Sequence, residues 1–151
     1  MTVLDEVAAV VTLQDLEKPP VRMFMFGMLT VLEMVLARSV EGAFPGEAWR
    51  LHVAPGRLQK AEALQAERRR RGQEVALLDC LQFSDKGQLA LRIPEVGQQV
   101  APELSRKAKL RAVKELEELR NHLAHSQEII PAGWARIVAF SASLDRLLES
   151  L

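Results

Sequence analysis

The sequence predicts an all-α fold, a single helical bundle of about five main helices. Two stretches in the second half of the chain carry apolar residues at intervals of three and four, the period of one face of an α-helix. Nowhere does the chain alternate apolar and polar residues over the length of a strand. No internal repeat or low-complexity segment marks a boundary, so we predict one domain over residues 1–151.

Three helices are predicted in the first half of the chain. Val3–Glu17 forms the first, and the two prolines after Lys18 end it because proline lacks an N–H and disfavours a helical residue before it. The second, Val21 to about Val40, is apolar on nearly every face, as expected for a helix enclosed on several sides. The third, Arg57–Arg71, is mostly solvent-facing, and Gly72 follows it where a left-handed residue is favoured.

The second half predicts two short helices and two long ones. Val75–Gln82 and Asp85–Arg92 are short, the latter capped by Ser84, and a loop follows over Pro94–Ala101. The longest helix runs from Pro102 to about Ser126, with its apolar stripe at Leu104, Ala108, Ala112, Leu116, Leu119 and Leu123. A final helix from Ala132 to the end has its stripe at Trp134, Ile137, Phe140, Leu144, Leu147 and Leu151, and should pack beside its predecessor.

Composition and cysteine usage indicate a cytoplasmic protein. The 20 basic and 20 acidic side chains cancel, so the chain lacks the general basic excess of a nucleic-acid binder, and any such contact would be local. Cys80 is the only cysteine, which fits a reducing compartment and a small core residue. The N-terminus carries Asp5 and Glu6 and lacks the positive region of a secretory signal.

Neither a membrane span nor a metal site is predicted. The apolar segment Val21–Ala37 contains Arg22 and Glu33 and is shorter than the roughly 20 residues that cross a bilayer. One cysteine and three histidines show no zinc-ligand spacing, so we expect neither a metal nor a cofactor.

The basic run Arg68–Arg71 has two explanations. Four cations could hold phosphates, because each displaces counterions from a nucleic-acid backbone. Their position at the end of a predicted helix, where cations interact favourably with the helix dipole, explains them equally well. We interpret the run as a solvated face.

The candidate functional site lies near the end of the longest helix. Six residues there hold an arginine, an amide and two imidazoles: Arg120, Asn121, His122 and His125. Arginine can hold a phosphate in bidentate fashion, and imidazole exchanges protons near neutral pH. RNA cleavage without a metal needs these groups, an arginine for the phosphate and a histidine for the proton of the 2′-hydroxyl or leaving oxygen. Arg120, Asn121 and His125 are therefore candidate catalytic residues, and His122 is auxiliary.

Helix geometry separates two members of this cluster. At about 100 degrees per residue Asn121 and His125 share a face, whereas Arg120 and His125 point about 140 degrees apart. Either the helix loosens near His125 or a second subunit supplies part of the site, so we expect a homodimer. A structural explanation is also open. Arg120 borders the apolar stripe and needs an anion, and Glu33 in the apolar helix is the obvious ion-pair partner, in which case the cluster only locks the bundle.

The segment Arg120-Asn121-His122-Leu123-Ala124-His125 resembles the motif of the HEPN superfamily, in which an arginine and a polar residue precede a histidine. Arg120, Asn121 and His125 match its three positions. The resemblance implies a helical bundle that dimerises with the two motifs facing one another. It also implies metal-independent endoribonuclease activity, often in toxins or defence effectors, with RNA as the substrate and an antitoxin or regulator as a partner. Other members are dimerising or ligand-sensing modules without demonstrated catalysis.

Two stretches, Leu77–Lys86 and Leu119–Gln127, also resemble the region that follows paired cystathionine-beta-synthase (CBS) domains in some bacterial proteins. Those CBS domains, which usually bind adenine nucleotides, are absent here. This resemblance implies a stand-alone relative or the C-terminal part of such a protein, with residues 1–17 as a connecting helix.

The sequence thus supports two main hypotheses, an RNA-cleaving HEPN-like homodimer and a non-catalytic regulatory module. A third, a membrane-associated bundle, depends only on the segment Met23–Leu36, which a core or a dimer seam explains more simply.

Overall fold

A computed structural model describes residues 2–3, 6–7, 12–99, 102 and 104–129. Over these residues the fold is helical, which confirms the predicted all-α class. The α-helices are α1 (Pro19–Ala43), α2 (Pro55–Arg70), α3 (Phe83–Ala90), α4 (Pro94–Gln99) and α5 (Arg106–Ala124). Short 3-10 helices are η1 (Leu13–Glu17), η2 (Pro45–His52) and η3 (Leu78–Cys80). The final helix predicted from Ala132 onward lies outside the described residues.

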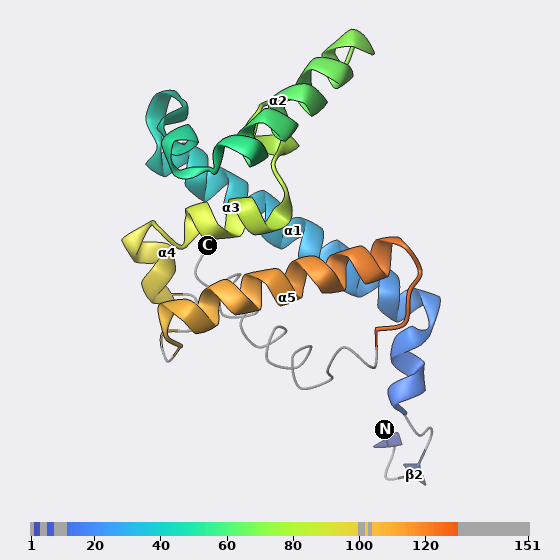
Figure 1. Cartoon of the computed structure of the whole chain (residues 1–151). Helices are drawn as coiled ribbons and strands as arrows, with labels where there is room; N and C mark the ends of the chain where they lie inside the picture. The colour runs from blue at the N-terminus through green and yellow to red at the C-terminus, as the bar shows by residue number, and fades with distance from the viewer. Residues whose placement is uncertain (1, 4–5, 8–11, 100–101, 103, 130–151) are drawn as a thin grey trace.

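The core lies where α1, α3 and α5 meet. These three helices pack on one another, with α5 crossing beside α1 and α3 next to both (Figure 1). Buried residues from all three, from η2 and η3, and from the segment after α5 form one apolar cluster, which includes Leu29, Val40, Trp49, Leu78, Cys80, Phe83, Leu89, Leu119, Leu123 and Ile129. The predicted core position of Cys80 is confirmed. The crossing of α3 and α5 determines which polar side chains meet near the candidate site.

Helix α1 confirms the predicted central helix and extends it to 25 residues. It is not enclosed on all sides, however, because Met23, Phe24, Val31 and Met34 are 75%, 67%, 43% and 50% exposed. Within the described part of the chain, α1 is the one helix long and apolar enough to cross a membrane by length and composition, and 33% of its most apolar window is buried. The predicted helix was judged too short to cross a bilayer, and the observed helix is long enough. The core helix of a globular protein has the same length and apolar composition.

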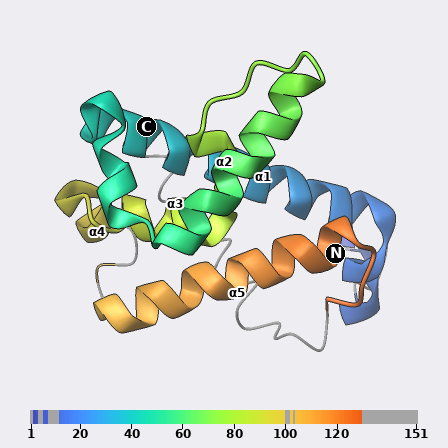
Figure 2. The same cartoon turned by 45° about the horizontal axis from the view of Figure 1, so that its top comes forward.

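Helix α2 leads away from the rest of the described fold in both views (Figures 1 and 2). Ala61 is its one buried residue, as expected for the predicted solvent-facing helix. Its end is a Schellman motif, in which the Gln73 amide donates to the Arg68 carbonyl and the Gly72 amide to the Arg69 carbonyl. Gly72 has a φ of 76°, the left-handed conformation that the sequence predicts there.

The N-terminal prediction is wrong, because residues 3–17 do not form one helix. Thr2–Val3 (β1) pairs antiparallel with Glu6–Val7 (β2), and η1 is the first helical segment among the described residues. Three of these four strand residues are β-branched, a class that favours extended backbone. Thr12 and Asp15 then start η1 as a capping box, the Asp15 carboxylate accepting from the Thr12 amide at 2.6 Å.

The region between α2 and α5 differs from its prediction in three places. The short helix predicted over Val75–Gln82 is reduced to η3, and the N-cap of α3 is Gln82 rather than Ser84. The predicted loop Pro94–Ala101 contains α4 instead. Pro94 ends the preceding turn and occupies the first position of α4, where a missing N–H costs nothing.

Candidate functional site

The last turn of α5 carries the candidate residues. The helix starts at Arg106, four residues later than predicted, with Ser105 as its N-cap, and ends at Ala124. A Schellman motif closes it, since the Gln127 amide donates to the His122 carbonyl at 2.9 Å and the Ser126 amide to the Leu123 carbonyl. Ser126 has a φ of 54°, which is unusual for a residue other than glycine. His125 therefore stands at the point where the chain leaves the helix.

A clamp of two charged side chains fixes this end of α5 to the start of α1. Arg22 Nη2 donates to the His122 carbonyl at 3.0 Å, and Arg22 Nη1 pairs with Glu17 Oε2 at 2.6 Å. Glu17 Oε1 accepts from the backbone amide of Ile129 at 2.7 Å. The side chain of Arg22 is only 15% exposed, so the pair is partly shielded from water. The clamp joins η1, α1, α5 and the segment after α5, and so holds the last turn in place.

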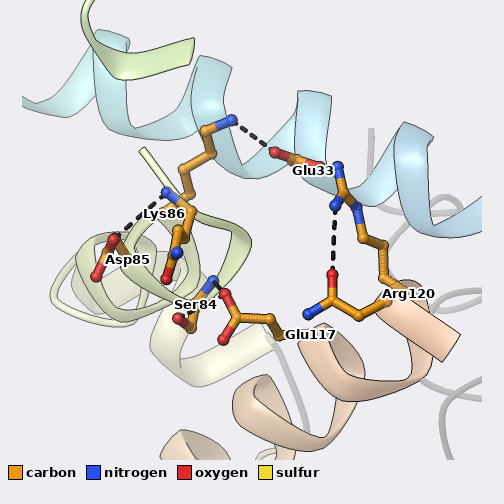
Figure 3. A network of polar contacts seen from close by, with 8 residues as sticks. Glu33, Ser84, Asp85, Lys86, Glu117 and Arg120 are labelled. Atoms are coloured by element: carbon orange, nitrogen blue, oxygen red, sulfur yellow. Dashed lines mark hydrogen bonds and ion pairs between the residues drawn. The ribbon is translucent and has the colours of Figure 1, made fainter. Parts of the chain in front are cut away.

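The structure brings together Arg120 and Asn121 but not His125. Arg120 Nη1 donates to Asn121 Oδ1 at 3.4 Å, a long hydrogen bond, and its side chain extends from α5 toward α1 (Figure 3). Arg120 is half-buried, whereas Asn121 and His125 are exposed. The His125 side chain has no hydrogen bond or ion pair with any other described residue. Because the helix is regular up to Ala124, the predicted separation of Arg120 and His125 around the axis remains.

Glu33 has a different partner from the one considered in the sequence analysis. Its Oε1 lies 2.6 Å from Lys86 Nζ, in an ion pair that joins α1 to α3 (Figure 3). The Lys86 side chain is 5% exposed and that of Glu33 is 20% exposed. No ion pair joins Arg120 to Glu33 or to any other acid among the described residues. The alternative in which Arg120 pairs with Glu33 and only stabilises the bundle is therefore without its ion pair.

A second polar contact ties α3 to α5. Glu117 Oε1 accepts from the Ser84 amide at 3.0 Å and from Ser84 Oγ at 2.8 Å (Figure 3). Its carboxylate thereby lies at the N-terminus of α3, where the helix dipole favours an anion. Nearby, burial raises the pKa of the Asp85 carboxyl, and Arg57 Nη1, 3.8 Å from Asp85 Oδ2, acts in the opposite direction.

His122 points its ring toward the interior. Its Nδ1 is buried and has no hydrogen-bond partner among the described residues. Beside the same turn lies a hollow of about 740 Å³ that Glu17, Arg22, Met23, Phe26, Leu123 and Ser126 help to line. His122 is therefore a less accessible group for chemistry than the exposed His125.

Metal-binding groups do not gather in the part of the chain that the structure describes, where no set of three or more His, Cys, Asp or Glu side chains could hold an ion.

No family model, curated protein or solved structure matches this chain. The HEPN and CBS-associated resemblances therefore stay predictions from the motif.

Sequence reasoning missed the contacts of Lys86, Ser84 and Glu117, which join α3 to α1 and to α5. One signal was present, because Lys86 follows Phe83 by three residues and precedes Ala90 by four, which places it on the buried face of α3. A lysine at such a position needs an anion nearby. The pattern does not say which helix supplies the anion.

Proposed function

We propose that this protein is a HEPN-like, metal-independent endoribonuclease of the toxin or defence type, which acts in the cytoplasm as a homodimer. The observation that carries the proposal is the state of Arg120. It is half-buried, lies beside Asn121, and has no acidic partner among the described residues, since Glu33 pairs with Lys86. A guanidinium of this kind is available to a phosphate of RNA.

The proposed reaction is an internal transesterification. A base removes the proton of the 2′-hydroxyl, the 2′-oxygen attacks phosphorus, and the bond from phosphorus to the 5′-oxygen breaks. An acid protonates the departing 5′-oxygen, which leaves a 2′,3′-cyclic phosphate and a 5′-hydroxyl. Arg120 would neutralise charge on the phosphoryl oxygens, and Asn121 would hold His125 or the phosphate. His125 would move one of the two protons.

A second subunit would complete the site. Within one chain the exposed His125 lies on a different face of α5 from Arg120, so the two groups of the motif do not converge on one phosphate. The exposed apolar face of α1, with Met23, Phe24, Val31 and Met34, supports self-association because such a stripe favours burial against a partner. We propose that the two motifs face one another, so that Arg120 of one chain acts with His125 of the other. An antitoxin or regulator is the further partner that this class implies.

The test is cleavage of a mixed RNA in EDTA by the purified protein, with Arg120→Ala and His125→Ala variants of verified fold and oligomeric state. We expect products that end in a cyclic phosphate, lost in both variants and restored when the two inactive variants are mixed into heterodimers that regain one complete site. Full activity in folded variants would refute the assignment. A Glu41→Gln variant, an exposed change far from the motif on α1, is the control.

A second candidate is a non-catalytic ligand-sensing module, for example the regulatory part of a CBS-domain protein. The hollow beside the last turn of α5 favours it, because about 740 Å³ is the size of a small-molecule pocket and its lining combines Met23 and Phe26 with Arg22. Calorimetric titration of the folded protein with adenosine monophosphate tests this function. Saturable binding that Phe26→Ala abolishes, together with no RNA cleavage, would favour it over the ribonuclease.

A further inference from the structure

One face of α5 forms an exposed polar stripe along the whole helix. Its members recur at intervals of four, three, four, three and four, the period of one helix face. All of them are exposed: Lys107, Arg111, Lys114, Glu118, Asn121 and His125. The stripe therefore leads from three cations at one end of α5 to two of the candidate catalytic residues at the other.

The cationic half of the stripe is mostly unneutralised. Arg111 is 79% exposed, and its Nε lies 3.3 Å from Glu115 Oε1. Lys107 and Lys114 have no ion pair among the described residues. All three cations line one hollow of about 460 Å³ on the helix surface. Glu118 interrupts the stripe between Lys114 and Asn121, so the positive charge is confined to its first half.

The basic first turn of α5, which includes Lys107 of the stripe, lies where the helix dipole disfavours cations. The N-terminal end of a helix is partially positive and favours acids, yet the first turn of α5 has no acid and holds Arg106 and Lys107. The run Arg68–Arg71 contrasts with it, since it ends α2, where cations are favoured, and both Arg70 and Arg71 pair with Glu67. A favourable interaction with the helix dipole explains the basic run at the end of α2, but it does not explain the basic start of α5. Binding of an anionic partner explains the basic start of α5.

We propose that Lys107, Arg111 and Lys114 bind the phosphate backbone of single-stranded RNA and direct it along α5 toward Asn121 and His125. This inference rests on the proposed ribonuclease function and assigns its substrate-binding surface. At 1.5 Å per residue, the cations extend over about 10 Å and His125 lies about 27 Å from Lys107 along the axis. Backbone contacts of this kind bind without regard to sequence, and the motif residues would then select the phosphate that is cleaved.

The test compares two triple variants in a His125→Ala background. Lys107→Gln/Arg111→Gln/Lys114→Gln neutralises the stripe, and Arg69→Gln/Arg70→Gln/Arg71→Gln removes the same charge from α2. Fluorescence anisotropy in EDTA gives Kd for a labelled single-stranded RNA at several salt concentrations. Each lost phosphate contact lowers the slope of log K against log salt by about 0.7, so the stripe variant should lose about 2 from the slope and at least tenfold in affinity. The α2 variant should keep the slope and affinity of its parent.

The outcomes separate this inference from the proposed function. If the stripe variant keeps the parent's slope and affinity, or if both triple variants lose equally, the inference is overturned, even where the native protein cleaves RNA. The absence of RNA binding by the folded parent overturns it too. If binding depends on the stripe but the native protein shows no cleavage in EDTA, the stripe is an RNA-binding surface and the ribonuclease proposal fails. Unchanged circular dichroism of both variants, expected for exposed substitutions, is the folding control.

Discussion

The Glu33–Lys86 pair should be a major determinant of stability, and Glu33→Gln tests this. The substitution keeps the shape of the side chain and leaves the ammonium of Lys86, in a side chain only 5% exposed, without its carboxylate. Removing one partner of a buried pair costs about 3 to 5 kcal/mol. We take about 3 kcal/mol here, the lower end, because the Glu33 side chain is 20% exposed and water can approach the pair.

Urea denaturation followed by circular dichroism measures the change. With a slope of roughly 2 kcal/mol per molar urea, a loss of about 3 kcal/mol moves the midpoint down by about 1.5 M with the slope unchanged. The double variant Glu33→Gln/Lys86→Met removes both charges and should recover most of the loss, since a neutral pair leaves no buried ion. With the single Lys86→Met variant completing the cycle, the resulting coupling energy should be at least about 2 kcal/mol.

A second cycle with Arg120→Ala is the matched control. The structure joins Glu33 to Lys86 and not to Arg120, so coupling between Glu33 and Arg120 should lie below about 0.5 kcal/mol. If Glu33→Gln changes stability by less than about 0.5 kcal/mol, or if Glu33 couples to Arg120 more strongly than to Lys86, the arrangement of the three side chains described above is refuted.

Three further substitutions test other parts of the fold. Gly87→Ala should cost about 2 kcal/mol by urea denaturation, because the new Cβ would lie 2.6 Å from Val113 Cγ1, and adding Val113→Ala should recover part of it; no loss would contradict the close contact of α3 and α5. Ser126→Gly should stabilise the protein by about 0.5 kcal/mol in the same assay, because Ser126 has a φ of 54°, and a loss would show that its side chain matters more than its backbone. The pKa of Asp15 is lowered to about 2 by Lys18 and Thr12, so its contribution to stability is present above pH 4 and is lost as pH falls toward 2. Asp15→Asn should therefore lower the melting temperature at pH 6 and have a much smaller effect near pH 2, where the native carboxyl is partly protonated, whereas an equal loss at both values would exclude the charge as the cause.

The sequence predicted on which face of α5 each candidate residue lies, but it did not predict which residues on other helices pair with one another. Helix periodicity alone places Asn121 and His125 on one face and Arg120 on another, and the structure retains that separation because α5 is regular to Ala124. The partner of Glu33 was not predictable. Periodicity gives angles about one helix axis, whereas an ion pair depends on distances of a few ångströms between helices, and these follow from how α1 crosses α3 and α5.

The sequence by itself determined the helical class, the central helix α1, the end of α2 at Gly72 and the buried positions Leu119 and Leu123 of the α5 stripe, whose predicted first member, Leu104, precedes the helix and is exposed. These features depend on local periodicity and on the backbone conformations of glycine and proline. The tertiary structure decided that Lys86 is buried against Glu33, that Ser84 binds Glu117 instead of capping α3, and that Arg120 lies beside Asn121 without an acid. The Lys86–Glu33 and Ser84–Glu117 contacts connect residues more than 30 positions apart, so only the packing of the helices selects these partners among those that the sequence allows.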